Sequence, residues 1–301
     1  MRDRAAASVM ASFIGDALAL GVHWEYSTRK LRQEFGRVDS YLDPGPGSYH
    51  RTRKKGEFTH YGDQAYVLLE SVASSGAFDA EDFSRRWRRL FEDYDGYLDQ
   101  ATRTTLENLS RGVPFLEAGS PSNDLSAASR VAPLVYALHS DEEALAEAAR
   151  TQAMLTHTDA LTVAASEFFA RAAHMVLRGA GPREAMEFLA GGRFSGTALA
   201  EAVAKGMATR GEDTIETVKG FGQDCHSPHA LPSVAHIVAS YQDDLEEALV
   251  QNVMAGGDSA ARGMIVGMLL GAHLGMQAIP RRWIDGLVRG PAVMGLLGRV
   301  G

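Results

Sequence analysis

Apolar residues along this chain recur at the three- and four-residue spacing of helices, and short segments rich in glycine, proline and polar residues separate these runs. The pattern predicts helices over residues 5–19, 64–73, 83–94, 127–138, 141–154, 161–178, 182–190, 196–208, 232–240, 245–253 and 260–275. Alternating strand patterns are almost absent, and no repeat or linker divides the chain. We therefore expect residues 1–301 to form one all-α domain.

Three segments interrupt the helical pattern, at residues 43–56, 119–124 and 220–231. Loops of this length in a helical domain often carry binding residues or act as lids. The 83–94 segment contains four arginines, Arg85, Arg86, Arg88 and Arg89, around an apolar stripe. A solvated helix face explains them better than a phosphate-binding patch, because amphipathic surface helices commonly have this pattern.

Composition narrows the possible functions. The formal net charge of −8 disfavours a general nucleic-acid-binding role. A single cysteine, Cys225, cannot form an internal disulfide, and we expect a cytoplasmic protein. Asp16 inside the first apolar run argues against a signal peptide, and the glycine-rich run at 264–274 is too short to span a bilayer. No membrane role is expected.

A Gly-Asp step occurs three times, at Asp16, Asp63 and Asp258, and each time it adjoins an apolar run. Glycine permits a sharp turn, and aspartate can cap the N–H groups of a following helix. Alternatively, the three carboxylates converge on one cleft as metal ligands or as acid and base groups. Both interpretations remain open from the residues alone.

Other polar residues accompany these steps. Asp16 lies in an apolar run and needs a partner for its charge, while Glu25 and His23 follow that run; for His23, simple packing is favoured over catalysis. The segment before Asp63 holds Thr59, His60 and Tyr61, which is more hydrogen-bonding capacity than a helix cap requires.

The third step opens a helix whose N-terminus is suited to phosphate. Arg262, three residues after Ser259, could add a charge-assisted contact there. Two weaker polar segments before helices contain Ser126 with Arg130, and His157. Around Cys225, two histidines could lower the pKa of the thiol, but an inert thiol is favoured.

Taken in order, these segments resemble the ADP-ribosylglycohydrolase family. The resemblance rests on Gly15-Asp16-Ala17-Leu18 with Glu25, on Thr156-His157, on Glu246-Glu247-Ala248-Leu249 before Gly256-Gly257-Asp258, and on Ile279-Pro280 with Trp283. It covers most of the chain. It implies an all-α, single-domain orthogonal helical bundle with a central cleft. The cleft of the family holds two Mg²⁺ or Mn²⁺ ions and binds small-molecule or protein-linked ADP-ribose.

Both metal-binding motifs of the family are depleted here, with Asp63 remaining from the early motif and Asp258 from the late one. Segments such as His60-Tyr61-Gly62-Asp63 resemble the divergent branch that contains selenoprotein J and the J1 crystallins. The resemblance implies that Asp63 and Asp258 act as catalytic residues or ligands of a remaining Mg²⁺, and that His60 and Tyr61 position or protonate the substrate. The implied ligand-binding residues are Asp16, Glu25, Ser126, Arg130, His157, Ser259 and Arg262.

Three functions follow from these residues. The first is a hydrolase of ADP-ribosyl or related nucleotide-ribosyl bonds that retains one metal ion at most. The second is a non-catalytic member that binds a ligand or serves structurally, as a crystallin does. The third is a thiol-based redox protein centred on Cys225.

Overall fold

The computed structural model describes residues 1–300. Within that range the chain forms no β-strand, so the predicted all-α class is confirmed. The helices are α1 (Arg2–Ala19), η1 (Leu20–Val22), α2 (Thr28–Phe35), α3 (His60–Ser75), α4 (Ala80–Leu90), α5 (Gln100–Ser110), α6 (Ser126–Ser129), α7 (Ala132–Ala137), α8 (Glu142–Met154), α9 (Ala160–Leu177), α10 (Pro182–Gly191), α11 (Ala198–Ala208), α12 (Thr214–Phe221), α13 (Ser227–Tyr241), α14 (Leu245–Met254), α15 (Ser259–Leu274), η2 (Met276–Ala278), α16 (Arg281–Gly286) and α17 (Gly290–Leu297).

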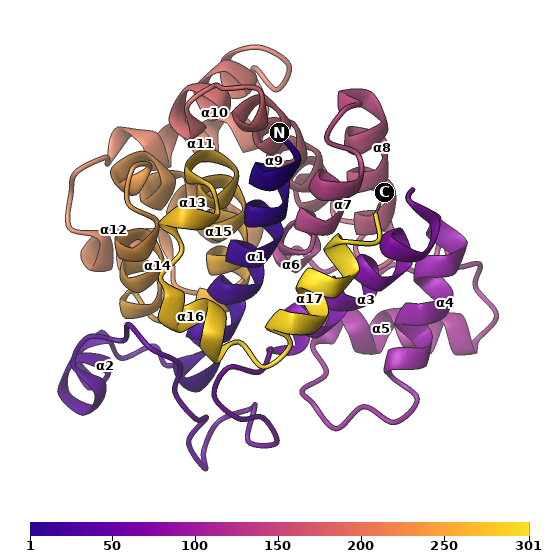
Figure 1. The fold of residues 1–301 in the computed structure, drawn as a ribbon, viewed down its shortest axis with the longest axis horizontal. Coiled ribbons are helices and arrows are strands. Elements are labelled where there is room, and N and C mark those ends of the chain that lie inside the picture. Colours follow the sequence, from indigo (N-terminus) through magenta and orange to yellow (C-terminus); the bar gives the residue numbers. More distant parts are fainter. Residues whose placement is uncertain (301) are drawn as a thin grey trace.

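Two buried helices, α1 and α15, form the centre of the bundle (Figure 1). They run antiparallel, and their backbones approach closely because small residues meet at successive turns. A Cβ atom added to Gly267 would lie 2.2 Å from the carbonyl oxygen of Ala11, and one added to Gly15 would lie 2.2 Å from that of Gly263. This seam places the N-terminus of α15 beside the residues that follow α1.

The remaining helices surround this pair. In Figure 1, α3, α4 and α5 lie on one side of α1, and α12, α13 and α14 lie on the other. The C-terminal α17 returns to the chain start, where Tyr136 on α7 donates a hydrogen bond to the carbonyl of Leu297 at 2.6 Å. By length and composition alone α1 and α9 could cross a membrane, but 89% and 72% of their apolar windows are buried inside the protein, as in core helices.

The structure differs from the helical expectation at prolines. The predicted helix at 127–138 is split into α6 and α7, and Pro133 occupies the first turn of α7, where its missing N–H leaves no bond unmade. Conversely, α13 begins at Ser227, inside the expected 220–231 loop, and continues through Pro232. The sequence pattern did not indicate α2, α5, α12, α16 or α17, which are short or largely exposed.

Two of the three Gly-Asp steps do not cap a helix. Asp258 is the N-cap of α15 and accepts a hydrogen bond from the N–H of Ala261. Asp63 lies within the first turn of α3, whose N-cap is Thr59. Asp16 lies in the last turn of α1 rather than at a helix entrance.

The α1–α15 seam gives a stability prediction. Gly267→Ala should lower the free energy of unfolding by about 1–3 kcal/mol, because the added methyl group collides with backbone that cannot move alone. Gly295→Ala in α17 is the matched control, since its Cβ would meet no atom within 4 Å. Urea unfolding should show this control unchanged or slightly stabilised. Equal effects of the two variants would contradict a tight seam.

Candidate active site

A glycine turn holds Asp258 in place at the start of α15. Gly256 and Gly257 have φ values of 72° and 65°, and a Cβ on Gly257 would lie 2.0 Å from the carbonyl oxygen of Gln223. The turn is also bonded to the segment after α1, because Trp24 N–H donates to the Gly257 carbonyl at 2.9 Å and Gly257 N–H donates to the Glu25 carbonyl at 2.8 Å.

The Asp258 carboxylate is buried among donors. Tyr61 donates its hydroxyl to Oδ2 at 2.8 Å, and Nε2 of His23 lies 3.3 Å from Oδ1. The Ala261 N–H and the Trp24 indole N–H approach at 3.3 Å and 3.4 Å. Although burial acts to raise the pKa of Asp258, the hydrogen bonds from His23 and Tyr61 lower it overall. Asp258 is therefore an ionised acceptor.

Two further carboxylate–imidazole pairs lie close to Tyr61. Nε2 of His60 is 3.2 Å from Oδ2 of Asp99, and Nε2 of His157 is 3.0 Å from Oδ1 of Asp124. Burial raises the pKa of the Tyr61 hydroxyl well above its usual value, and the nearby charges of Asp258, Asp124 and Asp99 raise it further. Tyr61 thus remains a neutral donor. We call the following group the histidine–carboxylate cluster: Tyr61, the carboxylates Asp99, Asp124 and Asp258, and the imidazoles His23, His50, His60 and His157.

A fourth imidazole extends the cluster, because Nδ1 of His23 lies 2.8 Å from Nε2 of His50. The rings of Trp24, Tyr49 and Tyr97 pack edge to face over the cluster, with centroids 4.9–5.3 Å apart. Trp24 has a φ of 66°, the sole non-glycine residue with positive φ within residues 1–300. Such strain persists where surrounding structure enforces it, and it is frequent at functional sites.

Several buried polar atoms of this region have no hydrogen-bond partner. They are Nδ1 of His50, both ring nitrogens of His60, and Oγ of Ser259. His60 is near Asp99 in distance, but its N–H is poorly aligned. Folded proteins rarely leave such groups unpaired without a bound water, ion or substrate. The cluster is therefore suited to receive a polar ligand.

Asp63 does not belong to the cluster. Its Oδ2 accepts hydrogen bonds from Tyr94 at 2.8 Å and from Arg53 at 3.1 Å, and it shares no hydrogen-bond partner with Asp258. It lines a separate pocket of about 250 Å³ that also contains Arg289. Asp63 and Asp258 therefore belong to different hydrogen-bond networks.

Asp16 supports the cluster by holding the start of α3, the helix that carries His60 and Tyr61. Its carboxylate accepts the Thr59 N–H at 2.7 Å and also the Thr59 hydroxyl, so it fixes the N-cap of α3. A Cβ at Gly62 would lie 2.3 Å from Oδ2 of Asp16, which requires glycine there. Burial raises the pKa of Asp16 to about 7. Asp16 therefore has a structural role at the start of α3.

The two arginines proposed as phosphate contacts are both buried and engaged within the protein. Arg262 donates to Oδ1 of Asn252 at 3.2 Å and to the Gly256 carbonyl at 2.5 Å. Arg130 donates to the side chain of Gln152 at 2.7 Å and to that of Gln64 at 3.0 Å. Burial lowers the pKa of each to about 10. They brace the loops around the cluster and offer no free face to phosphate.

Of the other predicted ligand-binding residues, Ser126 and His157 lie in the cluster, and Glu25 lies in a surface groove beside it. Ser126 donates its hydroxyl and its N–H to Asp124, and it lies 3.3 Å from Nε2 of His157. Glu25 pairs with Lys30 at 2.6 Å in a groove of about 330 Å³ that reaches His23 and Trp24. This groove is an approach to the cluster from the surface.

Cys225 lies near the cluster but is not activated. Burial raises the pKa of its thiol, and the nearby Asp258, Asp124 and Asp224 raise it further. The neighbouring His229 pairs instead with Asp224 at 2.9 Å. The hypothesis of a histidine-activated redox thiol is therefore not supported.

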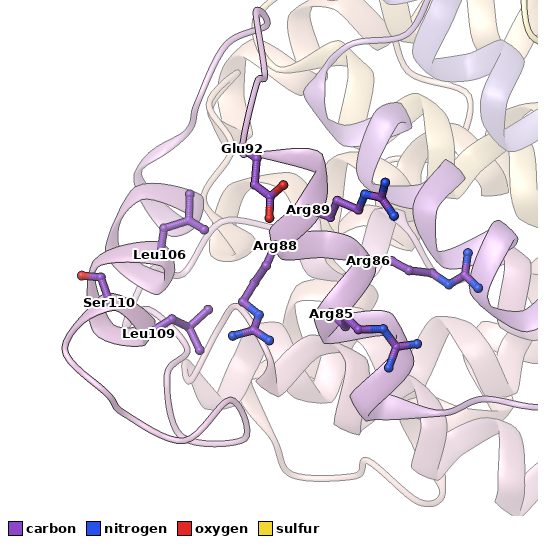
Figure 2. A pocket seen from close by; sticks show the side chains of 8 residues that line it. All are labelled: Arg85, Arg86, Arg88, Arg89, Glu92, Leu106, Leu109 and Ser110. Atoms are coloured by element: carbon purple, nitrogen blue, oxygen red, sulfur yellow. The ribbon is translucent and has the colours of Figure 1, made fainter.

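The arginine-rich helix α4 borders a cavity of about 720 Å³ facing α5. Figure 2 shows Arg85, Arg86 and Arg89 extending away from Leu106 and Leu109, so the four guanidinium groups do not gather at one point. Arg85 and Arg86 both pair with Asp82. This geometry agrees with a solvated helix face.

The donor set does not fit the two-metal centre that the family resemblance implies. The carboxylates around Tyr61 each face an imidazole, and Asp63 is bound to Arg53 elsewhere. Over residues 1–300, no group of three or more His, Cys, Asp or Glu side chains is arranged to hold a metal ion.

Sequence reasoning missed His50 and Asp99, and it favoured packing for His23. Asp99 is the N-cap of α5, a helix that the apolar pattern did not indicate. His50 lies in the irregular segment between α2 and α3, where no periodic signal exists. Only the adjacency of His23, Trp24 and Glu25 after an apolar run offered a clue.

Comparisons with known proteins agree with this fold. A sequence model of ADP-ribosylglycohydrolase matches residues 1–300, and the chain belongs to this family. A solved structure described as an ADP-ribosylglycohydrolase-related protein complex superposes with a TM-score of 0.81 at 28% identity, covering 99% of this chain and 97% of the other.

Related sequences include an uncharacterised protein of Archaeoglobus fulgidus, 30% identical over 93% of this chain and 90% of its own length. Crystallin J1A of Tripedalia cystophora is 24% identical, with coverage of 97% and 94%. The ADP-ribosyl-[dinitrogen reductase] glycohydrolase of Rhodospirillum rubrum is 25% identical, with coverage of 95% and 91%. The relatives thus include both a glycohydrolase and a crystallin.

Asp16 gives a pH prediction. Since its folded pKa is about 7 against a usual 3.8, the unfolded chain ionises first as pH rises. The stability contribution of Asp16 should therefore be greatest below about pH 4 and fall by up to about 4 kcal/mol towards pH 7. Urea unfolding of Asp16→Asn across this range should lack that fall. The exposed Asp3 on the same helix provides the control, Asp3→Asn, which should follow the wild type; an unchanged profile for Asp16→Asn would contradict the assignment.

Proposed function

We propose that this protein hydrolyses the glycosidic bond between an ADP-ribosyl or related nucleotide-ribosyl group and its acceptor. The observation that carries the proposal is the gathering of three carboxylate–imidazole pairs around Tyr61. Family membership and the glycohydrolase among the relatives support the class of reaction.

Glycosidic cleavage needs a proton for the leaving group and negative charge near the sugar carbon as positive charge develops there. His60 is suited to the first task by position, because it is buried beside Tyr61 and its Nε2 lies 3.2 Å from Oδ2 of Asp99. Although burial acts to raise the pKa of Asp99, its contacts with His60 lower it overall. His60 therefore acts as the proton donor in this scheme.

Asp258 and Asp124 supply the fixed negative charge. Both remain ionised, since hydrogen bonds and adjacent histidines lower their pKa values despite burial. Fixed charges in a site that excludes water stabilise a developing cation strongly, because they need no reorganisation during the reaction. Tyr61, donating to Asp258, keeps that carboxylate oriented.

A second function is a ligand-binding or structural member without turnover. The close packing of Trp24, Tyr49 and Tyr97 over the cluster favours it, as does the similarity to a crystallin. ADP-ribose binding measured by calorimetry, without release of product from ADP-ribosyl conjugates, would support this function over hydrolysis.

The separation of the two aspartates gives the decisive mutational test. Asp258→Asn retains a competent N-cap, so the variant should fold, yet we expect kcat/KM to fall by about 10²–10⁴ because the fixed charge is lost. Asp63→Asn should stay within a few-fold of the wild type, since Asp63 lies in the separate Arg53–Tyr94 pocket.

Chromatographic detection of released ADP-ribose, from small-molecule and protein-linked conjugates, measures both variants. Thermal unfolding of each variant controls for misfolding. If Asp63→Asn proves as damaging as Asp258→Asn at unchanged stability, the two carboxylates share a site in solution and the proposed arrangement is wrong.

A further inference from the structure

We infer that Trp24 is a gate, whose indole closes the surface groove off from Asp258 and moves aside to admit a ligand. The inference rests on the proposed hydrolysis, because it names the residue that controls access to the same site. It is carried by the position of Trp24 between the groove and the cluster, and by the strain in its backbone.

The surface groove ends at Trp24. Its walls include Trp24, Glu25 and Tyr49, and its volume is about 330 Å³. Asp258 is not among its walls and is only 1% exposed. The indole N–H of Trp24 nevertheless lies 3.4 Å from Oδ2 of Asp258. The indole therefore contacts both the groove and the carboxylate, and it separates one from the other.

The indole also covers imidazoles that lack hydrogen-bond partners. Its ring centroid lies 5.5 Å from that of His50 and 5.6 Å from that of His60. Within residues 1–300, Nδ1 of His50 and both ring nitrogens of His60 are buried and unpaired. Buried polar groups without partners cost free energy. The closed arrangement carries this cost, and moving the indole would let water or a ligand bond these nitrogens.

The backbone of Trp24 is strained in this arrangement. Its φ of 66° lies in the left-handed region, which a bulky side chain rarely adopts. Two backbone hydrogen bonds enforce the conformation, from Trp24 N–H to the Gly257 carbonyl at 2.9 Å and from Gly257 N–H to the Glu25 carbonyl at 2.8 Å. A relaxed φ would direct the side chain elsewhere. The strain therefore serves the placement of the indole, as strain at functional sites commonly does.

The indole is held weakly. Its N–H to Asp258 distance of 3.4 Å is longer than that of an ordinary hydrogen bond, and Tyr49 packs against it edge to face. His23 also lines the groove, but its two ring nitrogens contact His50 at 2.8 Å and Asp258 at 3.3 Å. Trp24 gives up one weak hydrogen bond when it moves, whereas His23 would give up two.

Fluorine NMR tests the gate without a ligand. The full-length protein labelled with 5-fluorotryptophan has three signals, from Trp24, Trp87 and Trp283, and Trp87→Phe and Trp283→Phe assign them. Trp87 and Trp283 are 3% and 1% exposed and serve as internal references. Relaxation dispersion should show exchange between two states for Trp24 on the microsecond-to-millisecond timescale and none for the references. A Trp24 signal without exchange would overturn the inference.

Removing the indole should leave the groove open. Trp24→Gly takes away the ring and relieves the strain, since glycine adopts a positive φ readily. If the open state of the wild type has a population of about 0.1–10%, a fluorescent ADP-ribose analogue should associate with this variant at least about tenfold faster in stopped-flow measurements.

The matched control is Phe35→Ala, which removes an aromatic ring from the same groove and leaves Trp24 in place; it should associate at the wild-type rate. Thermal unfolding confirms that each variant is folded. Trp24→Phe, which keeps a ring but lacks the N–H donor, gives a second measurement if Trp24→Gly does not fold, and its rate should also exceed that of the wild type. Association as slow as that of the wild type in the folded Trp24 variants would contradict the gate.

The outcomes separate the gate from the proposed hydrolysis. If ADP-ribosyl conjugates are hydrolysed while the fluorine signal of Trp24 shows no exchange, the gate fails and the proposed function stands. If Trp24 exchanges between two states but the protein neither binds ADP-ribose nor acts on its conjugates, the proposed function fails and the gate stands.

Discussion

The structure depends on one buried charge, the carboxylate of Asp258. An ionised carboxylate in an apolar interior is costly unless donors surround it. Here Tyr61, His23, Trp24 and the Ala261 N–H all converge on it. One side chain thereby caps α15, orients the start of α3 through Tyr61, and anchors the strained turn after α1.

The antiparallel α1–α15 seam makes this convergence possible. Because α1 ends where α15 begins, the residues that follow α1 lie against the N-cap of α15, although they are more than 200 positions apart in sequence. Close approach through Gly15, Gly263 and Gly267 brings the two helix ends within hydrogen-bond reach. The glycine content of these helices is thus a requirement of the site as well as of packing.

The helical class and most long helices were predictable, because a buried stripe imposes a regular apolar spacing. Tyr61, His60, Asp258, Ser126 and His157 were also recognisable as polar residues at helix entrances. Local sequence does not show which partners Tyr61 and Asp63 face. Residues 61 and 63 are two positions apart, about 200° around α3, so one faces Asp258 and the other faces Arg53. His50 and Asp99 belong to the cluster but lie in an irregular segment and at the start of a short helix. Their contacts with residues far away in sequence produce no periodic pattern, so the sequence could not predict them.

The proposed site contains imidazoles paired with carboxylates in place of a pair of metal-binding aspartates, and the sugar binds among these pairs. A crystal structure with ADP-ribose bound, grown in the presence of magnesium, tests this most directly. We expect the sugar carbon to lie against His60 and Asp258, with the nucleotide leading out past Trp24 and Tyr49. A sugar bound in the Asp63 pocket, or an ion bridging Asp63 and Asp258, would contradict it.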